Sequence, residues 1–389
     1  MDIYINHPTD RSNQLCDEVR TPEWACGFTF SESDRIVRVK PDGPYYYYLY
    51  AYNDIFQKIV GIGSKLHTSL VLPDSVRADV FAGKCKILLD HSLEGFNQGQ
   101  FNIPMLYTYL GEYLPYTIFA TGDYLETMNN HLPTYYINYW ERISARNGNM
   151  LQTLQHQQTV MENVPAVAKF KAICKNRLMR DHRIAIIKNI HDYDLVDKIN
   201  YSFGFVTSHG KNTYDPATFR SLITTAARLY GYDPGELLAF VADHGEKNLH
   251  HEIVDLSINH ASTVSDNLFA AHLDSYFEII VETNFYSETI FHSEKTFKAI
   301  AWVQPFVLCA EHHSVQTLRN FGYDVFDDFI DHSYDNIKDH PQRMTALFVE
   351  IQRLCKISDV EWIDMLTLIR PRLTANVNHL SLANNRFNI

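Results

Sequence analysis

Short apolar runs alternate with amphipathic segments along most of this chain. In the C-terminal half, residues 278–309 predict a strand, a loop, a helix and a second strand. Further apolar runs predict strands at 168–174 and 201–206, and amphipathic segments predict helices at 181–191, 216–250, 342–355 and 358–369. Because strands that alternate with helices are typical of parallel sheets covered by helices, this half indicates an α/β fold.

The N-terminal half shows the same alternation more weakly. Residues 86–90 and 116–121 predict buried strands, and residues 104–110 between them predict a helix. The aromatic run at 44–52 predicts either a strand or the start of a helix that extends to residue 60. The first 40 residues are polar and mixed and predict no element.

A polar stretch at 146–159 interrupts the pattern, and it predicts a domain linker near residues 150–167. We therefore expect two domains, 1–160 and 161–389, with a helical insertion at about 216–250 in the second. The expected architecture is two facing Rossmann-like α/β domains with a deep interdomain cleft, and such a cleft is a common place for a ligand.

Composition narrows the class of protein. The chain of 389 residues is 46% hydrophobic and 21% charged, as in ordinary globular proteins. Its formal charge of −12 argues against general coating of nucleic acid, because that affinity comes mostly from neutralising phosphates, although one local basic groove stays open. The six cysteines are scattered without a CxxC pair, which indicates a reducing compartment.

The chain also lacks the patterns that direct a protein to a membrane or into secretion. No apolar run approaches the roughly 18 residues that a membrane span requires. The first residues lack a basic segment followed by an apolar core, so we expect no signal peptide. These observations predict a cytoplasmic protein, in the host cytoplasm if the protein is viral.

The strongest candidate chemistry is at Ser293-Glu294-Lys295, which open the predicted helix of the 278–309 segment, just past its first apolar strand. Helix starts beyond strand ends bind phosphates and ribose in open α/β sheets, so a nucleotide-linked substrate is the first hypothesis. The alternative is structural, with Ser293 as a helix N-cap and Glu294 as a favourable first-turn acid.

Two segments resemble the α-1,3-fucosyltransferase family, nucleotide-sugar enzymes with the GT-B fold of two facing Rossmann-like domains. One segment contains a strand, Asn176, Arg183 and, fourteen residues after that arginine, Asp197. The other is Ser293-Glu294-Lys295 followed by the strand that begins after Pro305. The resemblance covers roughly 168–210 and 276–335. It extends to uncharacterised bacteriophage-type proteins with the same Ser-Glu-Lys block.

The resemblance implies a nucleotide-sugar donor. In the family, the residues that match Arg183 and Lys295 bind the diphosphate, and the residue that matches Glu294 holds the ribose. Ser293 and Asn176 belong to the same motifs. Lys198-Ile199-Asn200 stand where the family usually has glycines, so selection of fucose or guanine does not carry over. Arg177 and Arg180 either add phosphate contacts or lie on a solvated surface.

The chemistry of the donor fits these residue types. Breaking a sugar–diphosphate bond develops negative charge on the leaving group, which cations and helix starts stabilise. Lys295 supplies a point charge, and Arg183 offers a planar fork for two phosphate oxygens. The two oxygens of Glu294 can accept both ribose hydroxyls.

An acceptor hydroxyl requires a general base, which we expect in the N-terminal domain. Asp90 and Glu94 are the preferred candidates and Asp123 is a third, because all three lie at or just past predicted strand ends. For each of them the alternative is a solvated loop carboxylate or a helix cap.

Two other patterns suggest metal sites, but we predict neither a metal nor a separate cofactor. Asp192-Tyr193-Asp194 matches the Asp-x-Asp pattern of metal-dependent glycosyltransferases, yet it follows a helix and is better explained as a helix-end turn. The histidines of the C-terminal half lack a spacing such as HExxH, and the adjacent His250 and His251 point to different helix faces.

The predicted function is transfer of a sugar from a nucleoside diphosphate to an acceptor hydroxyl, with inversion and without a metal, as the resemblance implies. The acceptor candidates are a hydroxylated (hydroxymethyl) base in phage DNA, a surface glycan or a small molecule. A non-catalytic nucleotide-binding or partner-binding protein is the alternative of a different class. Oligomeric state does not follow from the sequence.

Overall fold

The computed structural model shows an α/β protein with two parallel sheets. The chain divides into two compact units, and we describe each by itself. Unit 1 comprises residues 1–143, 287–292 and 382–389, and unit 2 comprises residues 144–286 and 293–381. The described residues are 2–4, 35–37, 40–50, 70–91, 103–124, 134–136, 138, 141, 144, 151–163, 165–176, 179–203, 216–244, 271–286 and 289–385.

Unit 1 contains a six-stranded sheet in the order β2-β1-β3-β4-β5-β7, with every pairing parallel. A two-stranded antiparallel ribbon, formed by β6 (Asp123–Tyr124) and β11 (Ile290–Phe291), also belongs to this unit. The strands of the sheet are β1 (Asp2–Tyr4), β2 (Arg35–Val37), β3 (Tyr45–Tyr50), β4 (Cys85–His91), β5 (Thr117–Thr121) and β7 (Thr134–Tyr136).

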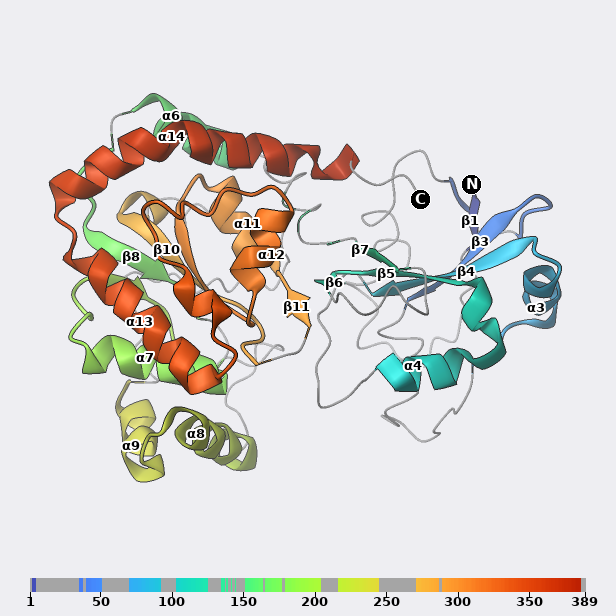
Figure 1. Ribbon diagram of the computed structural model, residues 1–389, viewed down its shortest axis with the longest axis horizontal. Coiled ribbons are helices and arrows are strands. Elements are labelled where there is room, and N and C mark those ends of the chain that lie inside the picture. Colours follow the sequence, from blue (N-terminus) through green and yellow to red (C-terminus); the bar gives the residue numbers. More distant parts are fainter. Residues whose placement is uncertain are drawn as a thin grey trace. The chain divides into compact units, whose positions relative to one another are not determined.

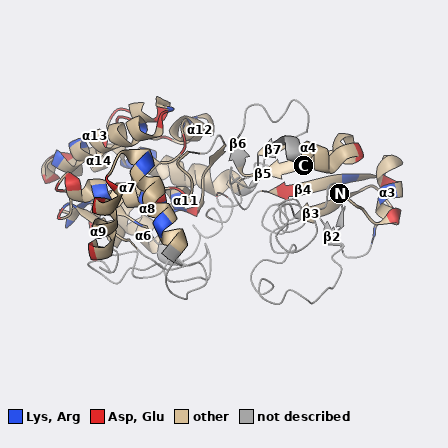
Figure 2. Ribbon diagram, turned by 90° about the horizontal axis from the view of Figure 1, so that it is seen from below, with Lys and Arg blue, Asp and Glu red and all other residues tan. Residues whose placement is uncertain are grey.

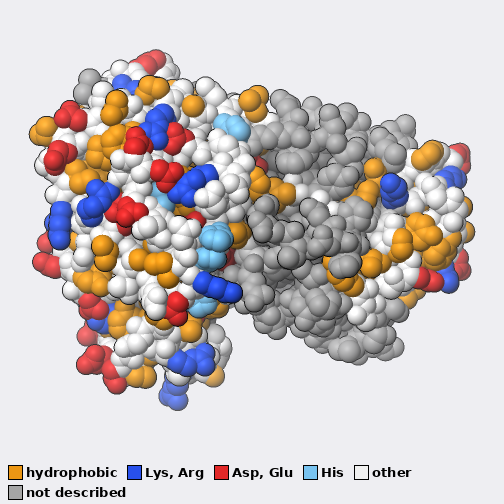
Figure 3. Space-filling model, in the orientation of Figure 1, with side chains coloured by type: hydrophobic (Ala, Val, Ile, Leu, Met, Phe, Trp, Pro, Cys, Tyr) orange, Lys and Arg blue, Asp and Glu red, His pale blue; other side chains and the backbone are white. Residues whose placement is uncertain are grey.

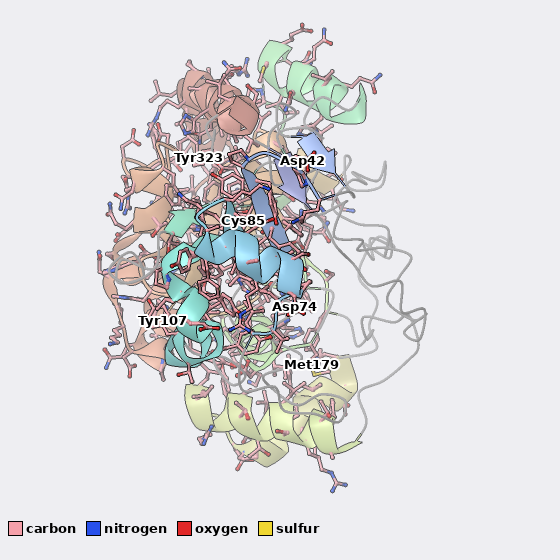
Figure 4. All side chains as sticks on the ribbon, turned by 90° about the vertical axis from the view of Figure 1, so that its right-hand side faces the viewer. Asp42, Asp74, Cys85, Tyr107, Met179 and Tyr323 are labelled. Atoms are coloured by element: carbon pink, nitrogen blue, oxygen red, sulfur yellow. The ribbon has the colours of Figure 1, made fainter. Side chains whose placement is uncertain are left out.

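The core of unit 1 explains why the aromatic run forms a strand rather than a helix. Alternate residues of a strand face the same side of a sheet, and Tyr45, Tyr47 and Leu49 all enter one apolar core. Helices α3 (Asp74–Phe81) and α4 (Ile103–Leu110) pack on that face, and Cys85 and Tyr107 belong to the same packed layer (Figure 4). A 3-10 helix (Gly111–Tyr116) connects α4 to β5.

Unit 2 contains a parallel four-stranded sheet in the order β12-β10-β8-β9. In chain order these strands are β8 (Phe170–Cys174), β9 (Ile199–Tyr201), β10 (Ser275–Val281) and β12 (Phe306–Cys309). The first strand, β8, therefore has the second strand, β9, on one side and the third strand, β10, on the other. The first four strands of unit 1 follow the same order, which is consistent with two Rossmann-like domains.

Helices cover both faces of the sheet in unit 2. Figure 1 shows α6, α11 and α14 on one side, α7 and α13 on the other, and α8 and α9 beyond α7. Their bounds are α6 (Leu151–Glu162), α7 (Asp181–Asp192), α8 (Pro216–Tyr230), α9 (Pro234–His244), α11 (Glu294–Ala301), α12 (Ser314–Asn320), α13 (His340–Lys356) and α14 (Asp359–Ser381). Short 3-10 helices follow at Ser333–Asn336 and Leu382–Asn385.

Most predicted elements with described residues are confirmed, with three corrections. The last helix, predicted at 358–369, continues to Ser381 as α14. The strand predicted at 201–206 lies earlier, at Ile199–Tyr201, because Ile199 is the buried residue that pairs with Ala172. The segment predicted as a linker at 150–167 contains helix α6. The glutamine-rich sequence of α6 has no apolar stripe that predicts a packed helix, because polar side chains make its contacts with the rest of unit 2.

Those contacts attach α6 to the end of α11. His156 Nε2 is 2.8 Å from the carbonyl oxygen of Trp302, and Gln157 Nε2 donates to the carbonyl oxygen of Ala301 at 2.8 Å. The last carbonyls of a helix lack partners within the helix, so α6 satisfies two of them for α11. The contact-based division therefore assigns α6 to unit 2, whereas the predicted division at residue 160 leaves most of it in the first domain.

The deep interdomain cleft stays a prediction. Within the described part of the chain, no helix combines the length and the apolar character needed to cross a membrane.

We expect Gln157→Ala to destabilise unit 2 by about 1–3 kcal/mol, because it leaves the buried Ala301 carbonyl without its partner. Gln155→Ala on the same helix is the matched control, because Gln155 is exposed. Urea unfolding followed by circular dichroism measures both variants. Equal stabilities would contradict the assigned role of Gln157.

Candidate functional site

The candidate site lies at the carboxyl edge of the unit 2 sheet, where the chain leaves each parallel strand. In the order 2-1-3-4, the connections from the first and third strands leave this edge in opposite directions, and the crevice between them is where open α/β sheets bind ligands. Here those strands are β8 and β10. The connection after β8 leads to α7, and the connection after β10 leads to α11.

Glu282, the first residue after β10, contacts the starts of both α7 and α11. It is fully buried, and its carboxylate accepts four hydrogen bonds. The donors are the backbone N–H of Thr283 at 3.2 Å, the backbone N–H and hydroxyl of Ser293 at 2.9 and 2.5 Å, and the hydroxyl of Thr296 at 2.6 Å. A buried carboxylate requires such donors, because its desolvation is otherwise costly. Glu282 therefore fixes the start of α11 against the end of β10.

The backbone of Glu282 binds the other helix. Its carbonyl oxygen lies 3.0 Å from His182 Nε2 and 3.4 Å from the Nη2 of Arg183, which donates to it. Burial lowers the pKa of His182, and both of its ring nitrogens face acceptors, Nε2 this carbonyl oxygen and Nδ1 the carboxylate of Asp181 at 3.3 Å. Through Glu282, the first turns of α7 and α11 are both held at the end of β10.

Ser293 is the N-cap of α11, and its hydroxyl is fully used inside unit 2. It donates to Glu282 and accepts from the backbone N–H of Lys295 at 3.3 Å and from Lys295 Nζ at 3.0 Å. The structural alternative for Ser293 is therefore present in the structure. A direct contact between Ser293 and a donor stays a prediction.

Glu294 and Lys295 form a partly exposed ion pair at the helix start. Lys295 Nζ is 2.9 Å from Glu294 Oε1, and the two side chains are 26% (Glu294) and 24% (Lys295) exposed. Burial by itself raises the pKa of Glu294, but the charges of Lys295 and Lys298 outweigh it and lower the pKa to about 2. Glu294 is therefore a carboxylate at neutral pH, and both side chains can reach a ligand.

Arg183 lies deeper than the predicted phosphate fork requires. The residue is only 3% exposed, so its charge acts from inside the edge of the sheet. A bidentate contact with a phosphate requires local movement of the chain over it. The spacing of the motif in the sequence located Arg183 at the start of α7. It could not predict how deeply the side chain is buried, because burial depends on tertiary packing.

Three further residues were predicted to bind the nucleotide-sugar donor, and the structure describes two of them. Asn176 follows β8 and is fully buried; its side-chain nitrogen is 3.3 Å from Cys174 Sγ, and its Oδ1 has no hydrogen-bond partner among the described residues. Arg180 precedes α7 as its N-cap residue and is half-buried. Arg177 lies outside the described residues.

The predicted general bases belong to unit 1. Asp90 lies inside β4 rather than beyond it, is fully buried, and accepts a hydrogen bond from the hydroxyl of Tyr48 at 2.8 Å. Glu94 lies outside the described residues, and Asp123 begins β6. Neither the role of Asp90 nor that of Glu94 follows from these contacts, and both stay predictions.

The two patterns that suggested metal sites have structural explanations where they are described. Asp192 ends α7, and Asp194 has a left-handed backbone with φ of 56°, which is the predicted helix-end turn. His312 and His313 stack with ring centroids 3.6 Å apart before α12. Histidine side chains are visible on the surface of unit 2 in Figure 3. Among the described residues, no group of three or more potential ligands is placed to hold a metal ion.

Sequence reasoning assigned no role to Glu282 or Thr296. The available signal was a glutamate directly after an apolar strand, eleven residues before a serine that opens a helix. That pattern predicts a buried carboxylate at a helix start only once the parallel sheet is known.

We expect Glu282→Gln to destabilise unit 2 by at least about 2 kcal/mol, because an amide cannot accept all four hydrogen bonds and loses the charge-assisted ones. Glu294→Gln, at a partly exposed pair, should cost at most about 1 kcal/mol. Urea unfolding of both variants measures the difference. A Glu282→Gln variant as stable as Glu294→Gln would contradict the role of Glu282.

Comparisons with known proteins add no assignment. A scan against protein-family models matches no family, and a search of curated proteins finds no similar sequence. The functional argument therefore rests on the residues and geometry described above and on the motif resemblance in the sequence.

Proposed function

We propose that this protein is a GT-B-type glycosyltransferase, which transfers a sugar from a nucleoside diphosphate to an acceptor hydroxyl. The shared 2-1-3-4 strand order of its two parallel sheets supports this proposal, because GT-B enzymes consist of two Rossmann-like domains. In the proposal, unit 2 binds the donor and unit 1 supplies the acceptor side. Fold alone does not assign function, so the site has to support the proposal.

The observation that carries the proposal is the pair of helix starts held by Glu282. Arg183 on α7 and Lys295 on α11 are 112 positions apart in the chain, yet Glu282 contacts Arg183 directly and Lys295 through Ser293. Both helices follow the carboxyl ends of adjacent strands, α7 after β8 and α11 after β10. Two helix starts and two cations at one edge of a sheet suit a dianionic group better than they suit a neutral ligand.

The donor chemistry follows from this arrangement. As the glycosidic bond breaks, the diphosphate gains negative charge, which Lys295, Arg183 and the start of α11 stabilise. Ser293 and Glu282 hold the helix start in place, so the positive groups are ordered before the donor binds. Metal independence and inversion rest on the family resemblance.

Glu294 suits the ribose in this proposal. Its low pKa keeps it ionised, and its two oxygens accept hydrogen bonds from the 2′ and 3′ hydroxyls. Lys295 Nζ donates a hydrogen bond to Glu294 Oε1 at 2.9 Å. Donor binding would exchange that ion pair for a lysine–phosphate and a glutamate–ribose contact.

On the acceptor side, Asp90 or Glu94 is proposed as the base that removes the proton of the acceptor hydroxyl. Asp90 is buried, so it becomes reachable only if the surrounding chain moves. A hydroxymethylated DNA base stays one candidate acceptor. Figure 2 shows that the Lys and Arg residues of the described helices are interspersed with Asp and Glu residues, which gives DNA no specific support over a glycan or small molecule.

We expect Lys295→Ala to weaken nucleotide-sugar binding about tenfold to a hundredfold, because it removes a charge-assisted phosphate contact. Arg183→Ala should weaken it similarly, and Arg183→Lys should keep part of the affinity. A thermal-shift panel of UDP-, GDP-, CMP- and dTDP-sugars identifies the donor, and calorimetry then measures each variant. A donor at 100 times its dissociation constant stabilises by roughly 2.7 kcal/mol.

Lys188→Ala is the matched control for Lys295→Ala. Lys188 is also partly buried and paired with a carboxylate, Asp192, but it lies toward the other end of α7. Normal donor affinity in folded Lys295→Ala and Arg183→Ala variants would overturn the proposed function. So would the absence of binding by every nucleotide sugar to the wild-type protein.

The ribose contact predicts a specific coupling. Glu294→Gln should weaken binding of the nucleoside diphosphate about tenfold, because a ribose hydroxyl loses a charged acceptor. The same substitution should change the affinity for the 2′,3′-dideoxynucleoside diphosphate by less than about twofold, because the partner hydroxyls are absent. Calorimetry on the four combinations measures the coupling. Equal losses for both ligands would exclude Glu294 as the ribose contact.

A further inference from the structure

Tyr286, five residues after β10, has an unusual orientation. The residue is 40% exposed, yet its hydroxyl donates a 2.7 Å hydrogen bond to Oδ2 of Asp181, which is 2% exposed. Tyrosine usually packs its ring against apolar surface and directs its hydroxyl to water. Here the hydroxyl is directed inward and part of the ring remains exposed to solvent.

The hydrogen bond between Tyr286 and Asp181 joins a neutral hydroxyl to an ionised carboxylate. Asp181 also accepts a hydrogen bond from the backbone N–H of His182 at 2.9 Å. Burial by itself raises the pKa of Asp181, but its interactions with His182 and its hydrogen bond from Tyr286 outweigh this effect and lower the pKa. Burial and the neighbouring carboxylate raise the pKa of Tyr286. The pair is therefore an ionised acceptor and a neutral donor throughout the neutral range.

The backbone beneath the ring is also fixed. Phe285 is buried, its carbonyl oxygen accepts a hydrogen bond from Arg343 Nη2, and the Arg343 guanidinium lies 4.3 Å from the centre of its ring. On α7, the ring of His182 stacks on Phe285 at 6.0 Å. The ring of His340, at the start of α13, lies 5.7 Å from the Tyr286 ring. The Tyr286 ring is thus held in one orientation at the carboxyl edge of the sheet.

We infer that the exposed ring of Tyr286 is the stacking surface for the nucleobase of the donor. This inference rests on the proposed nucleotide-sugar site and assigns its base subsite. Asp181, which holds the hydroxyl, is in the same helical turn as Arg183, so one helix start positions both the ring and a predicted phosphate cation. Tyr286 also follows the carboxyl end of β10 by five residues, and nucleotides bind at the carboxyl ends of the strands in doubly wound sheets.

A nucleobase fits this surface better than the transferred sugar does. A sugar presents several hydroxyls that need partners, but the hydroxyl of Tyr286 is already used by Asp181. What the ring offers is an apolar π face, and every nucleobase has a flat π face that stacks on aromatic side chains. Because the ring is already ordered, little side-chain entropy is lost when a base binds.

The test compares Tyr286→Ala with the matched control Tyr193→Ala. Tyr193 is also exposed, at 38%, but it lies at the opposite end of α7. Calorimetry measures binding of UDP, GDP, CDP and dTDP, of the matching nucleotide sugars, and of inorganic pyrophosphate. We expect Tyr286→Ala to weaken the preferred nucleoside diphosphate about fivefold to a hundredfold and its nucleotide sugar by the same factor. Pyrophosphate binding should stay within about twofold of the wild type.

Further variants separate stacking from folding. Tyr286→Phe and Tyr286→Trp keep an aromatic face and should stay within about threefold of the wild type, whereas Tyr286→Leu should behave like Tyr286→Ala. Thermal unfolding of each variant verifies that it is folded, and Tyr286→Leu against Tyr286→Phe decides the question if Tyr286→Ala is unfolded.

The possible failures are distinguishable. If a nucleotide binds the wild type and Tyr286→Ala behaves like Tyr193→Ala, the base assignment is overturned while the donor site stands. A loss seen with the nucleotide sugar but not with the nucleoside diphosphate would also overturn it, because the ring would then contact the sugar. If no nucleoside diphosphate binds the wild type, the proposed function itself fails.

Discussion

The arrangement of unit 2 around its candidate site depends on one buried carboxylate. Glu282 is fully removed from water at the end of β10, so its charge has to be matched by hydrogen-bond donors. Four donors surround it, and three of them come from Ser293 and Thr296 at the start of α11. The free energy of desolvating this group is thereby offset only when α11 begins at this place. The start of the helix is defined by that requirement.

The same residue connects the helix starts that the proposed site combines. Its side chain holds α11, and its carbonyl oxygen contacts His182 and Arg183 on α7. Helix starts carry positive partial charge, and here two of them meet where the strand connections diverge. A network of this kind stabilises the fold and also orders the cations before a ligand binds. The stabilising role and the proposed binding role are therefore different consequences of one set of contacts.

Burial divides the predicted site residues into two groups. Glu294 and Lys295 are about a quarter exposed and available to a ligand, whereas Arg183, Asn176 and Ser293 lie almost entirely inside. Tyr286, which donates a hydrogen bond to Asp181 at the start of α7, is 40% exposed. The outer group makes contacts that a ligand can exchange, and the inner group supports those contacts through charge and hydrogen bonding. Sequence motifs do not separate these groups, because the same residue types serve both.

The sequence predicted an element accurately where burial leaves a run of apolar residues, and less accurately where it does not. Apolar runs located β4, β5, β8, β10 and β12 well, because burial on a sheet leaves a direct trace in composition. Helix α6 was missed because its contacts to α11 use His156 and Gln157, and polar residues leave no apolar stripe. Strand β9 was placed several residues late, since three residues carry too little pattern to define a strand.

By itself, the sequence determined the α/β class, most element positions and the helix start at Ser293-Glu294-Lys295, because these depend on local patterns of burial and capping. Only the tertiary structure decided that both sheets share the order 2-1-3-4 and that α7 and α11 begin beside the same strand end. It also decided that Glu282 links them and that Tyr286 directs its hydroxyl inward. Strand order, depth and side-chain direction arise from long-range packing, and residues far apart in the chain carry no local record of their contact.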